Sequence, residues 1–356
     1  MSGLLEAVAS AEAGVAGADA HVARELESIR GRFADATAAL SGTRIEELPW
    51  YVFIGAPGSG KTTALLNSGL KFLLPSATSG VPIAGIGGTR NCDWWFTEEA
   101  VLLDTAGRYT TQDSNSRADA AAWHGFLGLL NEFRPGRPLN GAFVTVSLPD
   151  LMLWTKLERA KFTAHVRMRL AELYAALGAR FPVYLLVTKV DLLAGFLDFF
   201  GEYDPDKRAQ VWGNTFELEV DSVTLESRYA KEFEPLEARL NAEMLVRLHE
   251  ERDLQRRAAI YRFPQQFHPV GPLVGEFIGQ AFTAQVEHKA PQLRGIYYTS
   301  GTQQGNPIDR VLGTLVRTFG LERGKTVDRG NTGRSYFISR LLREVVLREA
   351  GLAAPL

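Results

Sequence analysis

The sequence GAPGSGKT at residues 55–62 constrains the fold more than any other stretch, because it matches the phosphate-binding loop pattern GxxxxGK[ST]. The apolar run Trp50–Ile54 before it predicts a buried strand, and Thr62–Leu70 after it predicts a helix. Strand, loop and helix therefore come in the order that the pattern requires. The alternative is a glycine turn followed by a chance Lys-Thr pair, which explains the letters of the loop but not both flanking elements.

The residue types in this loop predict how it would hold a nucleotide. Glycines allow successive backbone N–H groups to point inward, and the start of the following helix favours an anion. Lys61 is predicted to reach the β- and γ-phosphates, and the hydroxyl of Thr62 to ligate Mg²⁺. The predicted nucleotide-binding positions of the loop are Gly55, Gly58, Ser59, Gly60, Lys61, Thr62 and Thr63.

A second motif follows a predicted hairpin formed by Asn91–Thr97 and Ala100–Asp104. The buried run that ends in Asp104 continues as Thr-Ala-Gly, which gives DxxG at the carboxyl end of a strand. Asp104 is predicted to hold Mg²⁺ through water, and the backbone N–H of Gly107 to bond the γ-phosphate. An aspartate after four apolar residues is common by chance, but its place one hairpin after a phosphate loop indicates a nucleoside triphosphatase.

The stretch between these motifs predicts a further metal ligand. Residues 75–88 are rich in Gly, Ser and Pro and predict a loop, and Thr89 stands at its end. In GTPases a threonine at this place turns its hydroxyl to Mg²⁺ when the γ-phosphate is present. We therefore predict that Thr89 is a catalytic and metal-binding residue, with Thr78 in reach of the same role.

Arg108 follows the DxxG motif, at the position where Ras-like enzymes carry the glutamine that orients the attacking water. Hydrolysis is therefore predicted to be slow or to use another group, for which Gln112 and Asp113 are candidates. Arg108 itself could stabilise transition-state charge, or it could be a surface arginine on a switch loop. The sequence leaves both roles open.

A third motif predicts the base. The strand-like run 181–187 ends in TKVD, which fits the [NT]KxD motif of GTPases. The aspartate is predicted to accept hydrogen bonds from guanine N1 and N2, and adenine presents different donors and acceptors. The alternative is that this aspartate caps the next helix. A backbone N–H from the loop after the last strand is predicted to complete the purine site. The candidate base-binding residues are Thr188, Lys189, Asp191, Ser300 and Gly301.

Composition limits the class of protein. A chain of 356 residues with 46% hydrophobic and 22% charged residues predicts an ordinary globular protein of two or three domains. A formal net charge of −2 without a Lys/Arg run argues against nucleic acid as a partner. The one cysteine, Cys92, excludes an internal disulfide framework and indicates a reducing compartment. No signal peptide is visible and the apolar runs are too short to cross a bilayer, so we expect a soluble piece.

The order of the elements predicts an α/β fold of P-loop GTPase type, with about six mostly parallel strands and helices on both faces. One strand of the hairpin is expected to be antiparallel. Regular four-residue spacing of apolar residues predicts one long amphipathic helix over Glu232–Arg257. The expected divisions are a helical lead at 1–43, the core at 44–200, a helical insertion at 201–292, the last strand and loop of the core at 293–304, and a C-terminal helical segment at 305–356.

Longer strings of the sequence carry a resemblance to a known family. They are Leu48-Pro49-Trp50-Tyr51 running into GAPGSGKTTALLNSGL, then DTAGRY, TKVD, RGIYYTSGTQQG, Ser335-Tyr336-Phe337 and Glu349-Ala350-Gly351-Leu352. From about residue 44 to the end, these strings resemble the IcmF/TssM proteins of bacterial type VI secretion. One departure is Phe72-Leu73-Leu74-Pro75, where the family usually has Phe-Pro-Leu. This change puts no functional residue in doubt.

The resemblance implies a longer native protein, anchored in the inner membrane through segments absent from this chain, with this region as its cytoplasmic NTPase module and a periplasmic part beyond residue 356. It also implies partners: the other inner-membrane component, the outer-membrane lipoprotein and the cytoplasmic baseplate proteins. The family is often described as ATP-binding, whereas TKVD favours guanine. We therefore expect Mg²⁺ and GTP, with ATP as the alternative, in a slow nucleotide switch. The rival expectation is a catalytically idle scaffold that uses this fold for assembly.

Overall fold

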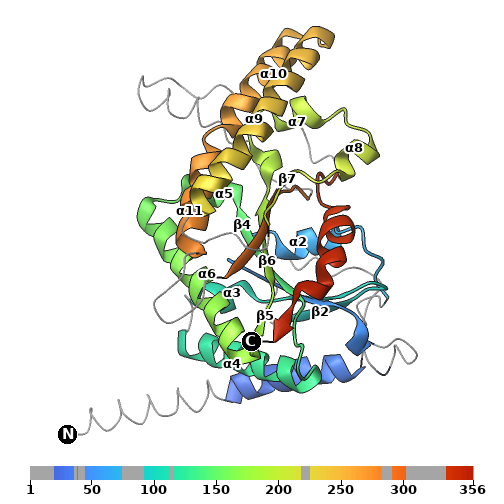
Figure 1. Cartoon of the computed structure of the whole chain (residues 1–356), viewed down its shortest axis with the longest axis vertical. Coiled ribbons are helices and arrows are strands. Elements are labelled where there is room, and N and C mark those ends of the chain that lie inside the picture. Colours follow the sequence, from blue (N-terminus) through green and yellow to red (C-terminus); the bar gives the residue numbers. More distant parts are fainter. Residues whose placement is uncertain are drawn as a thin grey trace, which may run out of the picture.

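The computed structural model describes residues 20–35, 38, 45–73, 92–112, 116–217, 225–282, 291–301 and 334–355. Its centre is a seven-stranded sheet in the order β2-β3-β1-β4-β6-β8-β7 (Figure 1). The inner strands β3, β1, β4, β6 and β8 run parallel, and the edge strands β2 and β7 are antiparallel to their neighbours. The predicted mostly parallel α/β fold is confirmed, with seven strands instead of about six.

The inner strands β1, β3, β4 and β6 are buried along their whole length, as expected for parallel strands covered on both faces. The seventh strand, β7, comes from the segment 201–292, which the sequence predicts as helical. The strands are β1 (Trp50–Gly55), β2 (Asp93–Phe96), β3 (Val101–Asp104), β4 (Gly141–Ser147), β6 (Pro182–Thr188), β7 (Gly213–Thr215) and β8 (Gln292–Tyr298), and a separate pair joins β5 (Ala179–Arg180) to β9 (Ala354–Pro355).

Helices cover both faces of this sheet. One hydrophobic cluster contains apolar residues from α4, α5, α6 and the α9–α11 segment, and a second, on the other face, contains residues of α2 and the C-terminal helical turns. The helices are α2 (Lys61–Leu66), α3 (Gly107–Thr111), α4 (Ser116–Phe133), α5 (Leu148–Leu153), α6 (Lys156–Leu177), α7 (Phe196–Phe200), α8 (Pro205–Ala209), α9 (Leu225–Glu250), α10 (Leu254–Phe267) and α11 (Val270–Ala281), with shorter turns η1 (Ile45–Glu47), η2 (Val190–Leu192), η4 (Leu342–Val346) and η5 (Leu347–Leu352). Within the described ranges, no helix has the length and apolar character needed to span a membrane.

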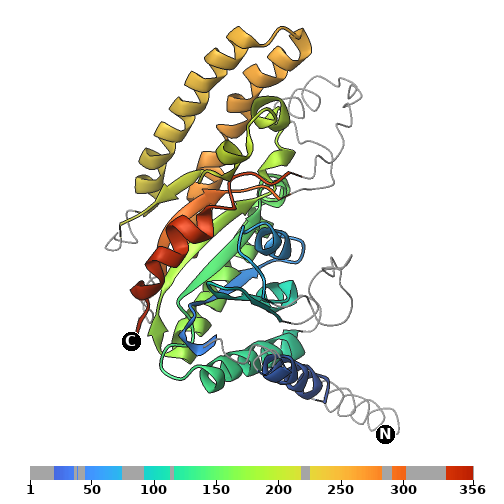
Figure 2. The ribbon, with the colours of Figure 1, turned by 90° about the vertical axis from the view of Figure 1, so that its right-hand side faces the viewer.

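Residues 20–35 form a helix that lies along α4, at the end of the molecule opposite the α9–α10 pair (Figure 2). Ile29 is fully buried, and Phe33 stacks on Phe133 of α4 with ring centroids 4.0 Å apart. Leu26 packs where Gly125 leaves room on α4, because a Cβ there would collide with the leucine methyls. The N-terminal lead therefore docks on the core through one apolar face.

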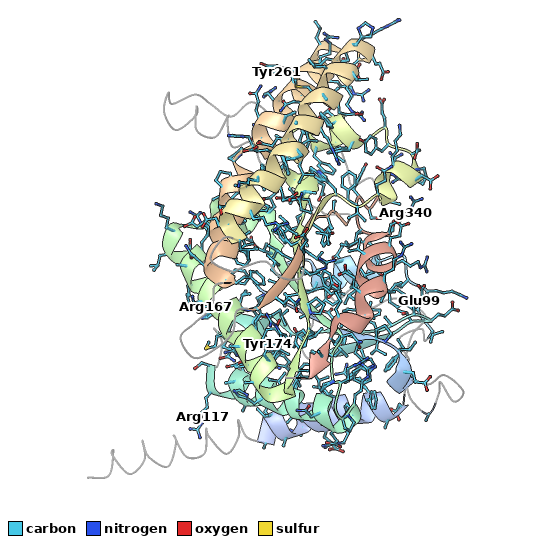
Figure 3. The ribbon with its side chains drawn as sticks, in the orientation of Figure 1. Glu99, Arg117, Arg167, Tyr174, Tyr261 and Arg340 are labelled. Carbon is cyan, nitrogen blue, oxygen red and sulfur yellow. The ribbon has the colours of Figure 1, made fainter. Side chains whose placement is uncertain are left out.

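The predicted single helix over Glu232–Arg257 is wrong at its C-terminal end. The structure has two helices, α9 and α10, which the segment 251–253 separates. In this turn the carboxylate of Glu251 accepts hydrogen bonds from two backbone N–H groups, and the side chain of Asp253 caps α10. The chain turns back here, so that Tyr261 lies near the outer end of the helix pair (Figure 3). Dense charge on both sides of the turn hid these caps in the sequence.

Two other predicted helices differ in extent. The helix expected over Thr62–Leu70 ends at Leu66, and the chain turns at Gly69, which has a φ of 74°. The helical sequence pattern of residues 151–177 predicts one helix, but the structure interrupts it, because Thr155 and Glu158 form a capping box that starts α6. α5 is therefore a separate turn directly after β4.

Asn140 joins the start of β1 to the C-terminal segment. Its Oδ1 accepts hydrogen bonds from the N–H of Trp50 at 2.9 Å and from Arg134 at 2.6 Å, and its Nδ2 donates to the carbonyl of Ala350 at 2.7 Å. Because this residue is buried, Asn140→Ala is expected to lower the free energy of unfolding by about 3 kcal/mol, roughly one for each lost bond. Urea unfolding monitored by circular dichroism measures this loss.

The matched control is Asn131→Ala, whose amide donates to the carbonyl of Ala176 at 2.8 Å from an exposed position. We expect a loss below about 1 kcal/mol, because water replaces the lost partner. Equal losses for the two variants would show that the buried network around Asn140 contributes no more than a surface bond.

Candidate functional site

The phosphate loop lies at the carboxyl end of β1, near the middle of the sheet, and leads directly into α2. Gly58 and Gly60 have φ values of 71° and 89°, which side chains with a Cβ rarely adopt. A Cβ on Gly60 would also lie 3.2 Å from Oγ1 of Thr188 at the end of β6. The backbone conformation therefore favours glycine at positions 58 and 60. Gly55 leaves room for β4, because a Cβ there would lie 2.5 Å from the carbonyl oxygen of Thr145.

Lys61 folds back over this loop. Its ammonium donates to the carbonyls of Gly55 at 2.8 Å and Ala56 at 3.0 Å. Burial lowers the pKa of Lys61 to about 8, although the nearby carboxylate of Asp104 raises it. A phosphate oxygen would favour the charged form that burial disfavours, so this side chain is suited to an anion.

The two predicted Mg²⁺ ligands that the structure describes lie together. The hydroxyl of Thr62, at the start of α2, donates to Oδ2 of Asp104 at 2.5 Å. Asp104 ends β3 and is fully buried, beside Phe53 of β1 in the parallel register. A hydroxyl and a carboxylate are the hard oxygen ligands that Mg²⁺ prefers, so this pair fits the metal. The third predicted ligand, Thr89, and its alternative, Thr78, lie outside the described residues.

Gly107 of the DxxG motif is packed against the phosphate loop. A Cβ on this residue would collide with the backbone nitrogen of Pro57 and lie 2.8 Å from the carbonyl carbon of Ala56. The N–H of Gly55 donates to the hydroxyl of Thr110 on α3 at 3.0 Å, which joins the same two segments a second time. The backbone after Asp104 therefore lies directly against the phosphate loop.

The guanidinium of Arg108 pairs with two carboxylates from other helices. It forms ion pairs with Glu25 at 2.5 Å and with Asp119 at 2.6 Å. Burial alone would lower the pKa of Arg108. The hydrogen bonds to Glu25 and Asp119 outweigh this effect, so the pKa is raised above its usual value. Of the two alternatives for water positioning, Gln112 ends α3 with a φ of 53°, and Asp113 lies outside the described residues.

The predicted base-binding residues gather beside the loop at the ends of β6 and β8. The hydroxyl of Thr188 donates to the carbonyl of Ser59 at 2.6 Å, so this motif touches the phosphate loop directly. Lys189 has a φ of 60°, a conformation that is rare without glycine and concentrates at functional sites. Gly301 lies against α2, because a Cβ there would collide with the methyl group of Thr63.

Asp191 has a buried carboxylate oxygen that could accept a hydrogen bond from a purine base. Its Oδ1 is buried and has no hydrogen-bond partner within the described part of the chain. Burial raises the pKa of Asp191, while a hydrogen bond from the side chain of Ser300 lowers it. A buried carboxylate oxygen without a donor is costly, and the N–H groups on the edge of guanine would supply donors. These residues therefore fit the guanine base.

Three residues that contact the predicted site residues were not predicted from the sequence. Thr110 holds Gly55, and Thr145, at the end of β4, bonds the hydroxyl of Ser59 at 2.7 Å. Tyr336 pairs its backbone with Ser300 in both directions, at 3.0 and 2.8 Å. None of the three lies in a recognised motif, although Tyr336 belongs to a string that carried the family resemblance.

Comparison with known proteins gives the family. The sequence family described as the IcmF-related N-terminal domain matches residues 116–356. The chain is 50% identical over 341 residues to a protein of Pseudomonas aeruginosa named Type VI secretion system component TssM1. This match covers 93% of the chain but only 31% of the length of that relative.

One similar solved structure is the signal recognition particle receptor SRb-GTP/SRX complex from Chaetomium thermophilum, with 16% sequence identity and a TM-score of 0.28. The match covers 43% of this chain and 76% of that chain. NFeoB from S. thermophilus bound to GDP.AlF4- and K+ is 14% identical with a TM-score of 0.26, over 66% of this chain and 99% of that chain. The family rests on the sequence matches, which cover most of the chain. The chain therefore belongs to the IcmF/TssM family.

Proposed function

We propose that this region is a Mg²⁺-dependent nucleoside triphosphate-binding module that prefers GTP, hydrolyses it slowly, and acts as a switch or assembly element of the type VI secretion membrane complex. One observation carries the proposal: three separate segments meet at the carboxyl ends of the parallel strands. They hold Lys61 and Thr62, then Asp104 and Gly107, and then Thr188 with Asp191. A structural core alone gives no reason for these residue types to converge.

The geometry supports a distinct role for each group. Lys61 would transfer its hydrogen bonds from the loop carbonyls to phosphate oxygens, and the N–H of Gly107 would bond the γ-phosphate. Thr62 and Asp104 would hold Mg²⁺, which neutralises phosphate charge when bound. Asp191 would accept from the guanine edge, with Ser300 as a neighbouring donor that lowers the pKa of its carboxyl group.

The proposed slow rate rests on Arg108. This residue stands where Ras-like enzymes carry the water-orienting glutamine, and its guanidinium is engaged in ion pairs with Glu25 and Asp119. The same observation favours a second candidate, a module that binds nucleotide without turnover and serves as a scaffold. ATP is the alternative nucleotide.

The place of action follows from the family. The printed name of the Pseudomonas aeruginosa relative supports a role in type VI secretion. We propose that the region is the cytoplasmic part of an inner-membrane protein and that its partners are the other inner-membrane and baseplate components, with no nucleic acid. Bound nucleotide would alter the loops around the site and so the contacts with these partners.

Equilibrium binding of fluorescent Mg²⁺-GTP and Mg²⁺-ATP to the purified chain tests the proposal. We expect saturable binding with a preference for GTP, weakened by chelation of Mg²⁺ with EDTA, and phosphate release far below that of a GTPase with an active water-orienting group. Release of phosphate at a rate indistinguishable from a no-protein control, together with tight binding, would support the scaffold candidate. Absence of binding to either nucleotide would contradict both.

A further inference from the structure

Glu25 lies outside the nucleotide site but contacts the segment that follows the DxxG motif. It is on the helix 20–35 and only 4% exposed. Its carboxylate accepts hydrogen bonds from the guanidinium of Arg108 at 2.5 Å and from the hydroxyl of Tyr109. These are the two residues that directly follow Gly107, so a remote helix holds the part of the chain proposed to contact the γ-phosphate.

Arg108 joins Glu25 to a second buried carboxylate. Asp119 of α4 binds the second terminal nitrogen of Arg108 at 2.6 Å, and the guanidinium lies over the ring of Tyr109, 4.9 Å from its centroid. One arginine is thus shared between two buried carboxylates from two different helices. Charge-assisted hydrogen bonds from Arg108 and Tyr109 hold the carboxylate of Glu25 in place. Removal of this carboxylate would leave Arg108 only partly paired.

Helix α3 depends on such outside contacts for its position. It has five residues, too few to be stable alone, and the side chain of its N-cap residue, Ala106, offers no capping bond. On its other side, Arg169 of α6 donates to the carbonyl of Tyr109 at 3.4 Å. The placement of Gly107 against the phosphate loop therefore follows from where the neighbouring helices hold Arg108 and Tyr109.

We propose that Glu25 is a positioning residue for the γ-phosphate contact: by holding Arg108 and Tyr109 it keeps Gly107 against the phosphate loop and so favours nucleoside triphosphate over diphosphate. This rests on the proposed function. Because coupling between two sites is reciprocal, bound triphosphate also stabilises the docked position of helix 20–35. A change in the docking of this helix therefore changes the nucleotide preference, and a change of nucleotide changes the docking.

The test compares Glu25→Gln with wild type for binding of a non-hydrolysable GTP analogue and of GDP, both with Mg²⁺. Since only the triphosphate reaches Gly107, we expect the preference for triphosphate to fall about tenfold in Glu25→Gln, with GDP affinity within about twofold of wild type. Tyr109→Phe keeps the ring and removes only the hydroxyl, so it is the milder second variant, with an expected fall of about threefold.

The matched control is Glu132→Gln. Glu132 accepts a bond from Arg30 at 2.9 Å on the surface, where an ion pair contributes little to the docking of the helix, and it has no contact to α3 among the described interactions. Its triphosphate preference is expected to equal that of wild type. In the nucleotide-free proteins, hydrogen exchange of the amides at 107–112 is expected to be faster in Glu25→Gln and unchanged in Glu132→Gln.

The outcomes separate this inference from the proposed function. A wild-type protein that binds no nucleotide would overturn both. A wild-type protein that prefers triphosphate, with the same preference and the same amide exchange in Glu25→Gln, would overturn this inference alone. Equal weakening of triphosphate and diphosphate in Glu25→Gln would also overturn it, because that result indicates a general structural role.

Discussion

Replacing Lys61 by alanine is expected to weaken Mg²⁺-GTP binding at least about 100-fold, which corresponds to roughly 3 kcal/mol. The ammonium is buried inside the phosphate loop and its two bonds go to neutral carbonyls, so a phosphate would find its charged donor already in place. The variant loses that donor without replacement. Titration with a fluorescent GTP analogue, in parallel with ATP, measures the loss.

The variant should keep its fold, which makes the result interpretable. Burial lowers the pKa of Lys61 to about 8, so the folded protein pays a free-energy cost to hold this side chain charged at neutral pH. Removing the charge relieves that cost and offsets the two lost hydrogen bonds. We expect the free energy of unfolding to change by less than about 2 kcal/mol.

Lys71→Ala is the matched control for this experiment. Lys71 lies ten positions further along the chain and binds Glu98 at 2.6 Å on the surface, with 74% of its side chain exposed. Its removal is expected to leave nucleotide binding unchanged, since an exposed ion pair contributes little. If Lys61→Ala bound Mg²⁺-GTP as tightly as Lys71→Ala did, the proposed role of the loop in binding would be wrong.

The sequence predicted the parts of the site that are coded locally. A glycine-rich loop, a buried strand ending in Asp104 and the TKVD tetrapeptide each need only a few adjacent residues, and the parallel strands then bring their carboxyl ends to one edge. Trp94 and Trp95 show the same logic in the core: the alternation of a strand sends them to different hydrophobic clusters. Local pattern and sheet geometry are therefore enough to place these residues in the fold.

Contacts between distant segments were beyond the reach of the sequence. Glu25 and Arg108 are 83 positions apart, and nothing in the spacing of the N-terminal helix marks one glutamate among its other charges. The sequence left Arg108 open between a catalytic and a surface role, and the structure places it in an internal ion-pair cluster. The sequence did not predict the break between α9 and α10, for a different reason. The four-residue apolar spacing continues up to the turn, and the capping residues Glu251 and Asp253 lie among other charged residues.

The position of Asp191 makes base choice a second sensitive test of the site. A hydrogen bond from Ser300 favours the charged form of the Asp191 carboxyl group, while Oδ1 is buried and lacks a partner within the described residues. Guanine N1 and N2 both carry hydrogens that a carboxylate can accept. Adenine lacks this pair of donors, so its binding should depend little on the charge of this residue.

Asp191→Asn is therefore expected to weaken GTP binding by about 10- to 100-fold, roughly 1–3 kcal/mol, and to leave ATP binding within about twofold of wild type. The new amide donates a hydrogen bond where the carboxylate accepted one. Xanthosine triphosphate carries a carbonyl in place of the guanine amino group, so its affinity should rise in the same variant. Competition of each nucleotide against a fluorescent analogue gives all three constants.

The control is Asp206→Asn, which removes an exposed carboxylate that pairs with Arg340 at 3.0 Å on α8. We expect no change in the ratio of GTP to ATP affinity for this variant. An unchanged ratio in Asp191→Asn as well would mean that TKVD does not read the base in this protein. Because the phosphate contacts are independent of the base, that result would leave the loop at 55–62 as a nucleotide site and would favour ATP as an equal ligand.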